Sequence, residues 1–103
     1  MLDELYLISQ GLNHRFADGN SPFQTMTRLL EEGGELAAEV NHFEGMGVKR
    51  EKHGEPDRQH LANEILHVMV CALQLGLYYH VESELDEIIA RSINRLRQEG
   101  WIE

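Results

Sequence analysis

The sequence predicts an all-α fold, in which a four-helix bundle-like protomer associates into a dimer or tetramer. Three observations support this prediction. Apolar residues recur at helical spacing, without the alternation typical of strands. Glycine and proline gather at a few boundaries. One predicted helix is apolar almost all round, and in a chain of 103 residues such a helix needs a second subunit to cover it. Residues 1–103 are expected to form a single domain.

The first two helices are delimited by clear start and stop signals. The first is predicted from about Asp3 to about Phe16 and is ended by the stretch A-D-G-N. The second is expected to begin at Ser21-Pro22-Phe23-Gln24, because serine can cap, proline suits the first helical position and glutamine can close a capping box. It should end near Phe43, before two nearby glycines.

The second half of the chain predicts a polar loop and two more helices. The loop is expected over residues 45–56. The third helix should follow a cap at Asp57 and continue to about Tyr79. The fourth should begin near Glu82 or Ser83 and stop at Gly100.

The composition limits which binding partners and which cellular compartment the protein can have. The formal net charge of −9 argues against nucleic acid and against an anionic membrane, since both require a basic surface. It is compatible with a nucleotide, because a divalent cation can bridge acidic side chains to phosphate. The single cysteine excludes an intrachain disulfide, and with no signal-peptide pattern at the N-terminus we expect a cytoplasmic protein.

The second helix carries an acidic face. Its carboxylates fall within one arc roughly a quarter-turn wide at 100° per residue, and its apolar residues fall on the opposite side. A solvated acidic face is one interpretation. However, like charges at this spacing repel, and Gly33 and Gly34 in mid-helix cost on the order of 1 kcal/mol each relative to alanine. Stability alone therefore explains this segment poorly. The acidic residues are Glu31, Glu32, Glu35 and Glu39, and the apolar ones are Phe23, Met26, Leu30, Ala37 and Val40.

The third helix is apolar in nearly all directions except along one strip. An unpaired carboxylate on such a helix is expensive to desolvate, so Glu64 needs a cation, a hydrogen-bond partner or water. Three interpretations remain open: a local pair with His67, a metal site shared with the acidic arc of the second helix, or a transition-metal site built mainly by His60, Glu64 and His67. The strip consists of His60, Glu64, His67, Cys71, Gln74 and Tyr78.

These motifs resemble the MazG-like all-α nucleoside triphosphate pyrophosphohydrolases over most of the chain, from about Pro22 to Arg97. The family pattern is E-E-x-x-E on one helix and E-x-x-D on the next. The first element stands here as Glu31-Glu32-Gly33-Gly34-Glu35, and the second as Glu64-Ile65-Leu66-His67. His67 departs from the pattern, because the family carries aspartate at that position. Imidazole weakens a preference for Mg²⁺, so the identity of the metal and the activity itself stay open.

The resemblance implies a homodimer or homotetramer that hydrolyses a nucleoside triphosphate between the α- and β-phosphates, giving the monophosphate and pyrophosphate. It implies Glu32, Glu35, Glu64 and His67 as ligands of Mg²⁺, or of Mn²⁺ given the histidine. Glu31 would bind a second ion or orient the attacking water, and with Glu35 it completes the expected catalytic pair.

The fourth helix offers donors for phosphate. Similar family helices supply a basic residue and an asparagine, which favours Arg91 and Asn94, followed by Arg95. Alternatively, these basic residues only complement the dipole at the helix C-terminus. The leading prediction is thus a metal-dependent nucleotide pyrophosphohydrolase. The alternatives are a non-catalytic helical module of the same fold that binds nucleotide or a protein partner, and a metal-binding oligomeric bundle unrelated to nucleotides.

Overall fold

The computed structural model describes residues 2–45 and 54–103. Within this part of the chain there are four α-helices and no β-strand, so the predicted all-α class is confirmed. Each helix begins and ends within two residues of its predicted bounds, and most of the predicted loop, residues 46–53, lies outside the described residues. The helices are α1 (Leu2–Arg15), α2 (Pro22–Phe43), α4 (Arg58–Tyr78) and α5 (Glu82–Gln98).

The predicted caps are present at the starts of α2 and α4. The Gln24 backbone N–H donates to Ser21 Oγ and the Ser21 N–H donates to Gln24 Oε1, both at 3.2 Å, so the capping box is closed. The Gln59 N–H donates to Asp57 Oδ1 at 2.9 Å. These local signals fix where each helix begins and therefore which residues of α2 and α4 lie opposite one another.

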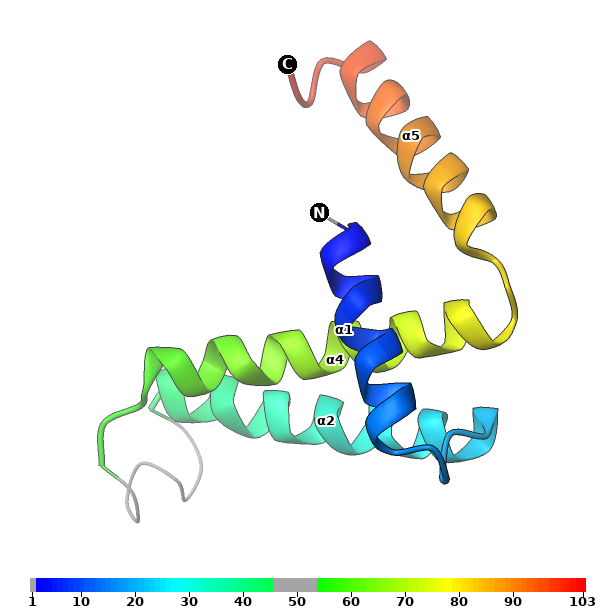
Figure 1. Ribbon diagram of the computed structural model, residues 1–103. Helices are drawn as coiled ribbons and strands as arrows, with labels where there is room; N and C mark the ends of the chain where they lie inside the picture. Colours follow the sequence, from blue (N-terminus) through cyan, green and yellow to red (C-terminus); the bar gives the residue numbers. More distant parts are fainter. Residues whose placement is uncertain (1, 46–53) are drawn as a thin grey trace.

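The helices α2 and α4 form an antiparallel pair, and α1 crosses this pair and packs on α4 (Figure 1). Ser9 ties α1 to α4, because its hydroxyl donates to the Leu5 carbonyl at 2.9 Å and lies 3.3 Å from the Val70 carbonyl. Gly76 allows the two helices to approach closely, since a Cβ added there would lie 3.5 Å from the Tyr6 hydroxyl. The α2–α4 pair is the framework that positions the candidate site.

The acidic side of α2 faces α4, as the interpretation of a shared metal site expected, because Glu32 and Glu39 lie against His67 and His60. The apolar side of α2 is uncovered in the single chain, where Phe23 is 85% exposed and Leu30 is 70% exposed. The buried residues of α2 are instead polar: Thr25, Glu39 and His42. The helix turns this way because its carboxylates meet histidines of α4, as described below, and its apolar side is left uncovered in the single chain.

Burial within one chain is low. The accessible surface is 7860 Å², whereas a compact protein of 11.9 kDa would expose roughly 6,000 Å². The radius of gyration is 16.7 Å, against about 13 Å for a compact chain of this length. The helix α5 has no buried residue and contacts only α4 among the described helices. It projects away from the others (Figure 1), so the four helices do not close into a bundle within one chain.

Among the described residues, α4 is the one helix that is long and apolar enough to cross a membrane. The core helix of a soluble protein passes the same test of length and composition. The helices α1 and α2 pack against α4, and Glu64 is buried in the middle of it. These features favour a core helix.

Candidate metal centre

Two carboxylates and an imidazole converge between α2 and α4. One ligand atom each from Glu32, Glu64 and His67 lies within 4.8 Å of the other two. His67 Nδ1 is hydrogen-bonded to Glu32 Oε2 at 3.2 Å and lies 3.9 Å from Glu64 Oε2. His67 is therefore closer to the carboxylate on the other helix than to the one three residues before it, and the cluster is built across the two helices.

Glu64 is the buried member of the cluster, with a side chain that is 7% exposed. Its Oε2 atom accepts no hydrogen bond from the described part of the chain. A carboxylate oxygen in this situation carries a desolvation cost that a bound cation would offset. The chemistry of the donors fits a divalent ion, and an imidazole beside two carboxylates suits Mn²⁺, Fe²⁺ or Zn²⁺ better than Mg²⁺.

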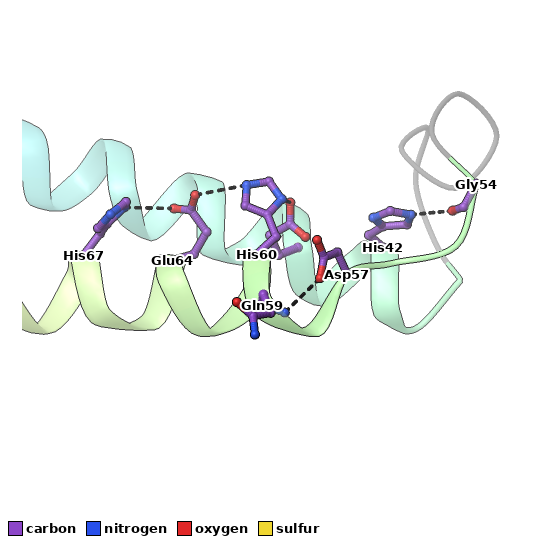
Figure 2. Close-up of polar contacts among 8 residues, drawn as sticks. His42, Gly54, Asp57, Gln59, His60, Glu64 and His67 are labelled. Carbon is purple, nitrogen blue, oxygen red and sulfur yellow. Dashed lines mark hydrogen bonds and ion pairs between the residues drawn. The ribbon is translucent and has the colours of Figure 1, made fainter.

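A second histidine approaches Glu64 from the opposite direction. His60 Nε2 lies 3.5 Å from Glu64 Oε1, and His60 Nδ1 lies 3.2 Å from Glu39 Oε1 on α2. Figure 2 shows Glu64 on α4 between His60 and His67, with an ion pair drawn to each. Glu39 is 1% exposed, so the interpretation of a solvated acidic face does not hold for this residue.

The remaining acidic residues of the predicted motif lie beside this row. Glu31 and Glu35 are exposed, and together with Gly34, Glu64 and His60 they line a hollow of ≈ 640 Å³. Neither belongs to the group of mutually close ligand atoms formed by Glu32, Glu64 and His67. The structure thus brings three of the four predicted ligands together and sets Glu35 in the adjoining hollow.

A pocket of ≈ 560 Å³ adjoins the other side of the cluster and shares Glu32 and His67 with it. Such a volume lies within the range of small-molecule sites, about 300–1,000 Å³. Its walls combine apolar side chains of α1 with polar groups from the α1–α2 connection, α2 and α4. They include Ile8, Leu12, Phe16, Asp18, Asn20, Arg28, Cys71 and Gln74.

Arg28 holds one wall of this pocket in place. Its guanidinium donates to the Gly19 carbonyl at 2.6 Å, to Asn20 Oδ1 at 3.1 Å and to Thr25 Oγ1 at 3.3 Å. These hydrogen bonds hold the connection between α1 and α2 against the first turns of α2.

Cys71 lies in the same pocket and behaves as a buried thiol. Burial raises its pKa, and the negative charge of Glu32 raises it further, while Arg28 lowers it to a smaller extent. The thiol is therefore protonated at neutral pH, which argues against a nucleophilic role.

The predicted phosphate donors are not near the cluster in one chain. Arg91, Asn94 and Arg95 are all exposed on α5, where Arg95 Nε lies 3.5 Å from Glu99 Oε2. Since α5 projects away from α2 and the middle of α4 (Figure 1), the same chain does not bring these side chains to the carboxylates.

Comparison with known proteins places the chain beside one relative. It is 41% identical over 81 residues to a protein of Bacillus subtilis (strain 168) described as "Uncharacterized protein YpjD", a match that covers 79% of this chain and 71% of the relative. The chain belongs to the YpjD family. No protein-family model matches the chain, and no solved structure matches it. The YpjD name assigns no activity, so the resemblance to the MazG-like group stays a prediction based on its motifs.

Sequence reasoning did not single out Arg28 or the partnership of Glu39 with His60. Arg28 organises a pocket wall through contacts that no sequence motif signals. The spacing of Glu39 after Glu32 and Glu35 placed it on the acidic arc, but its burial depends on which residue of α4 stands opposite. That relationship is long-range and cannot be obtained from the periodicity of one helix.

Proposed function

We propose that this member of the YpjD family is a metal-dependent nucleoside triphosphate pyrophosphohydrolase. The single observation that carries the proposal is the adjacency of the pocket and the carboxylate–histidine cluster, which share Glu32 and His67. A nucleotide has a largely apolar base with polar edges at one end and a charged polyphosphate at the other. The pocket suits the base, and a cation in the cluster suits the polyphosphate.

The pocket has groups that can recognise a base. Phe16 and Leu12 offer apolar surface for the flat face of the ring. The carboxamide of Gln74 lies at the pocket wall, where its Nε2 donates to Asn13 Oδ1 at 2.9 Å. Hydrogen-bonding groups in fixed positions discriminate between bases by the pairing of their edges.

A divalent ion bound by Glu32, Glu64 and His67 would neutralise the triphosphate and lower the pKa of a coordinated water. In the hydrolysis, the oxygen of water forms a bond to phosphorus, and the bond between that phosphorus and the oxygen bridging the α- and β-phosphates breaks. The bridging oxygen leaves with the electron pair, and a carboxylate takes the proton of the water. Glu31 and Glu35, exposed beside Glu64, are available for this proton transfer.

The proposal includes a homodimer or homotetramer. The uncovered apolar side of α2 and the exposed apolar residues of α5, among them Ile88 and Leu96, support association of chains. Arg91, Asn94 and Arg95 would then contact phosphate bound in the site of a partner. A soluble, cytoplasmic oligomer accounts for the apolar α4 and for the single buried cysteine.

The test is release of pyrophosphate from a panel of nucleoside triphosphates, with Mg²⁺ and then with Mn²⁺. Turnover with at least one base is expected, and it should be lost in Glu64→Gln, which keeps the shape of the side chain and removes its charge. His14→Gln, an exposed substitution on α1, serves as the matched control. A folded, metal-loaded protein that releases no pyrophosphate with either ion would refute the enzymatic function.

The alternative is a non-catalytic module that binds nucleotide or a protein partner. The observation that favours it is His67 at the position where the family pattern has aspartate, which leaves the cluster with one carboxylate fewer. Nucleotide binding measured by calorimetry, without pyrophosphate release, would support this second function.

A further inference from the structure

We infer that Arg28 binds the α-phosphate of a nucleotide held in the same chain. The inference rests on the proposed function, because it takes the pocket of ≈ 560 Å³ as the place of the base and the cluster of Glu32, Glu64 and His67 as the place of the cation. The phosphate contact would come from α2, whereas the resemblance favoured donors on α5.

The positive charge of Arg28 is balanced by no carboxylate among the described residues. Its hydrogen-bond acceptors are the Gly19 carbonyl, the Asn20 carboxamide and the Thr25 hydroxyl, which are all neutral. The ion pairs in the described part of the chain join other residues. Arg28 is half-buried, and a cation without a counterion in such a place carries a desolvation cost that a bound anion would offset.

The guanidinium of Arg28 is held in place and still has donors to offer. Its Nη1 donates one N–H to Gly19, and its Nη2 donates to Asn20 and to Thr25. The Nε–H and the second N–H of Nη1 meet no acceptor among the described residues. A planar guanidinium that is already fixed suits phosphate oxygens, because little side-chain freedom is lost when the phosphate binds.

Arg28 lies where the pocket meets the cluster. It precedes Glu32 by one helical turn, so the two side chains are neighbours on one face of α2. Both line the pocket, and the guanidinium is near enough to the Cys71 thiol to lower its pKa. A nucleotide with its base in the pocket and its outer phosphates on the cation would have its α-phosphate at this boundary.

Arg28 differs in this respect from the other basic side chains. Among the described residues, no second lysine or arginine lines either of the two hollows beside the cluster. On α5, Arg95 is already paired with Glu99. The bond that breaks in the proposed reaction adjoins the α-phosphate, so a fixed positive charge there would stabilise the charge that develops in the transition state.

The experiment compares each common nucleoside with its 5′-monophosphate, by calorimetry in EDTA, on the unmodified chain and on Arg28→Gln. Repulsion between phosphate and the metal-free carboxylates is the same in both proteins and cancels in the comparison. Arg28→Gln should weaken the monophosphate relative to its nucleoside about 10- to 100-fold, as expected for loss of a hydrogen bond between charged groups. The nucleoside fills the same pocket and reports any loosening of its wall.

Thr25→Val is the control for a purely structural role of Arg28. It removes one acceptor of the guanidinium, keeps the positive charge and lies outside the lining of the pocket. It should change the affinities for nucleoside and monophosphate by the same factor. Circular dichroism checks that each variant is folded. Arg28→Lys decides the question if Arg28→Gln does not fold, since it loses the planar fork and should show a smaller selective loss for the monophosphate.

The outcomes separate the phosphate contact from the proposed function. Equal weakening of nucleoside and monophosphate in Arg28→Gln would overturn the contact and leave the pocket as the site of the base. A nucleoside that binds the unmodified chain while its monophosphate does not would overturn the contact as well. Binding of neither compound, with any base, would refute the nucleotide pocket and the contact together. A selective loss in Arg28→Gln, without release of pyrophosphate from triphosphates by the metal-loaded chain, would support the contact and refute only the enzymatic function.

Discussion

His67 Nδ1 is hydrogen-bonded to Glu32 Oε2 at 3.2 Å, although 35 residues separate them along the chain. The contact joins α4 to α2 at the point where Glu64 is buried. It makes the histidine, and not a carboxylate, the third member of the cluster. The choice of cation should therefore depend on this one residue more than on any other.

His67→Asp should shift the preference of the cluster from Mn²⁺ toward Mg²⁺. Without metal, three neighbouring carboxylates repel one another, and we expect the free energy of unfolding to fall by on the order of 1 kcal/mol. With Mg²⁺, the added anionic oxygen should increase both the thermal shift and the release of pyrophosphate. Differential scanning fluorimetry in the two metals measures the first effect, with His14→Asp as control. A loss of activity in Mg²⁺ would mean that the histidine is adapted to its own metal.

Arg28→Ala should loosen the connection between α1 and α2. It removes three hydrogen bonds from a charged donor, and contacts of this kind contribute about 1.5–3 kcal/mol to stability. It also removes the positive charge that lowers the pKa of Cys71, so this pKa should rise and the thiol should react more slowly with iodoacetamide at pH 8.

Arg28→Lys is the matched control, since it keeps the charge and loses the forked geometry. It should preserve much of the thiol reactivity but not the stability. Equal losses of both properties in the two variants would contradict the separate roles of charge and geometry.

Gly34→Ala should raise the stability of the fold and weaken ligand binding. A Cβ at this position meets nothing within 4 Å, so alanine should stabilise α2 by about 1 kcal/mol through helix propensity alone. Gly34 lines the hollow beside Glu64, and a methyl group there should weaken binding of a triphosphate that approaches the backbone.

Gly33→Ala is the control, because a Cβ there also meets nothing within 4 Å and Gly33 is absent from the lining of the hollow. Thermal unfolding and calorimetry measure the two effects. Unchanged triphosphate affinity in Gly34→Ala would show that no ligand approaches α2 at this point.

The starts of the helices could be predicted from the sequence because their signals are local. The capping box of Ser21 and Gln24 and the cap at Asp57 are formed by neighbours in the chain, and they appear as expected. The polar strip of α4 was found in part, since Glu64, Cys71 and Gln74 are buried, whereas His60, His67 and Tyr78 are exposed. The caps depend on neighbouring residues and the strip depends on the helical repeat, so both can be predicted from a short stretch of sequence.

The burial of individual residues on α2 could not be predicted in the same way. The interpretation of a shared metal site placed the acidic arc beside Glu64, but the helical period alone did not show that Glu39 is buried and Phe23 exposed. The reason is long-range: Glu39 lies opposite His60, and Glu32 lies opposite His67. Pairing between helices depends on their register, which the sequence of either helix alone does not contain.

Tyr6→Phe should remove a loss of folding stability that the unmodified chain shows at alkaline pH. The Tyr6 hydroxyl is buried and has no hydrogen-bond partner among the described residues. Burial raises its pKa, and the charges of Glu82 and Asp86 raise it further. The pKa of Tyr6 is higher in the folded state than in the unfolded state. The folded chain therefore keeps its full stability below the unfolded pKa of this tyrosine and loses stability as the pH rises from there toward the folded pKa.

The variant should thus equal or exceed the unmodified chain in stability at pH 7, by up to about 1 kcal/mol, because an unsatisfied polar group is removed. The difference should grow in favour of phenylalanine above the unfolded tyrosine pKa, about 10. Urea unfolding at pH 7 and at pH 10.5 measures it. A large loss of stability at pH 7 would show that the hydroxyl has a partner after all.

Mixing two inactive variants should restore activity if the phosphate donors come from a second chain. Glu64→Gln disables the cluster, and Arg91→Ala disables the donor on α5, which lies away from the cluster of its own chain (Figure 1). In a dimer with exchanged donors, a mixed pair has one site with both defects and one site with neither. After refolding together, half of the dimers are mixed, so roughly a quarter of the unmodified activity should return. A donor that acted within its own chain would leave every site defective, and the mixture would stay as inactive as its components.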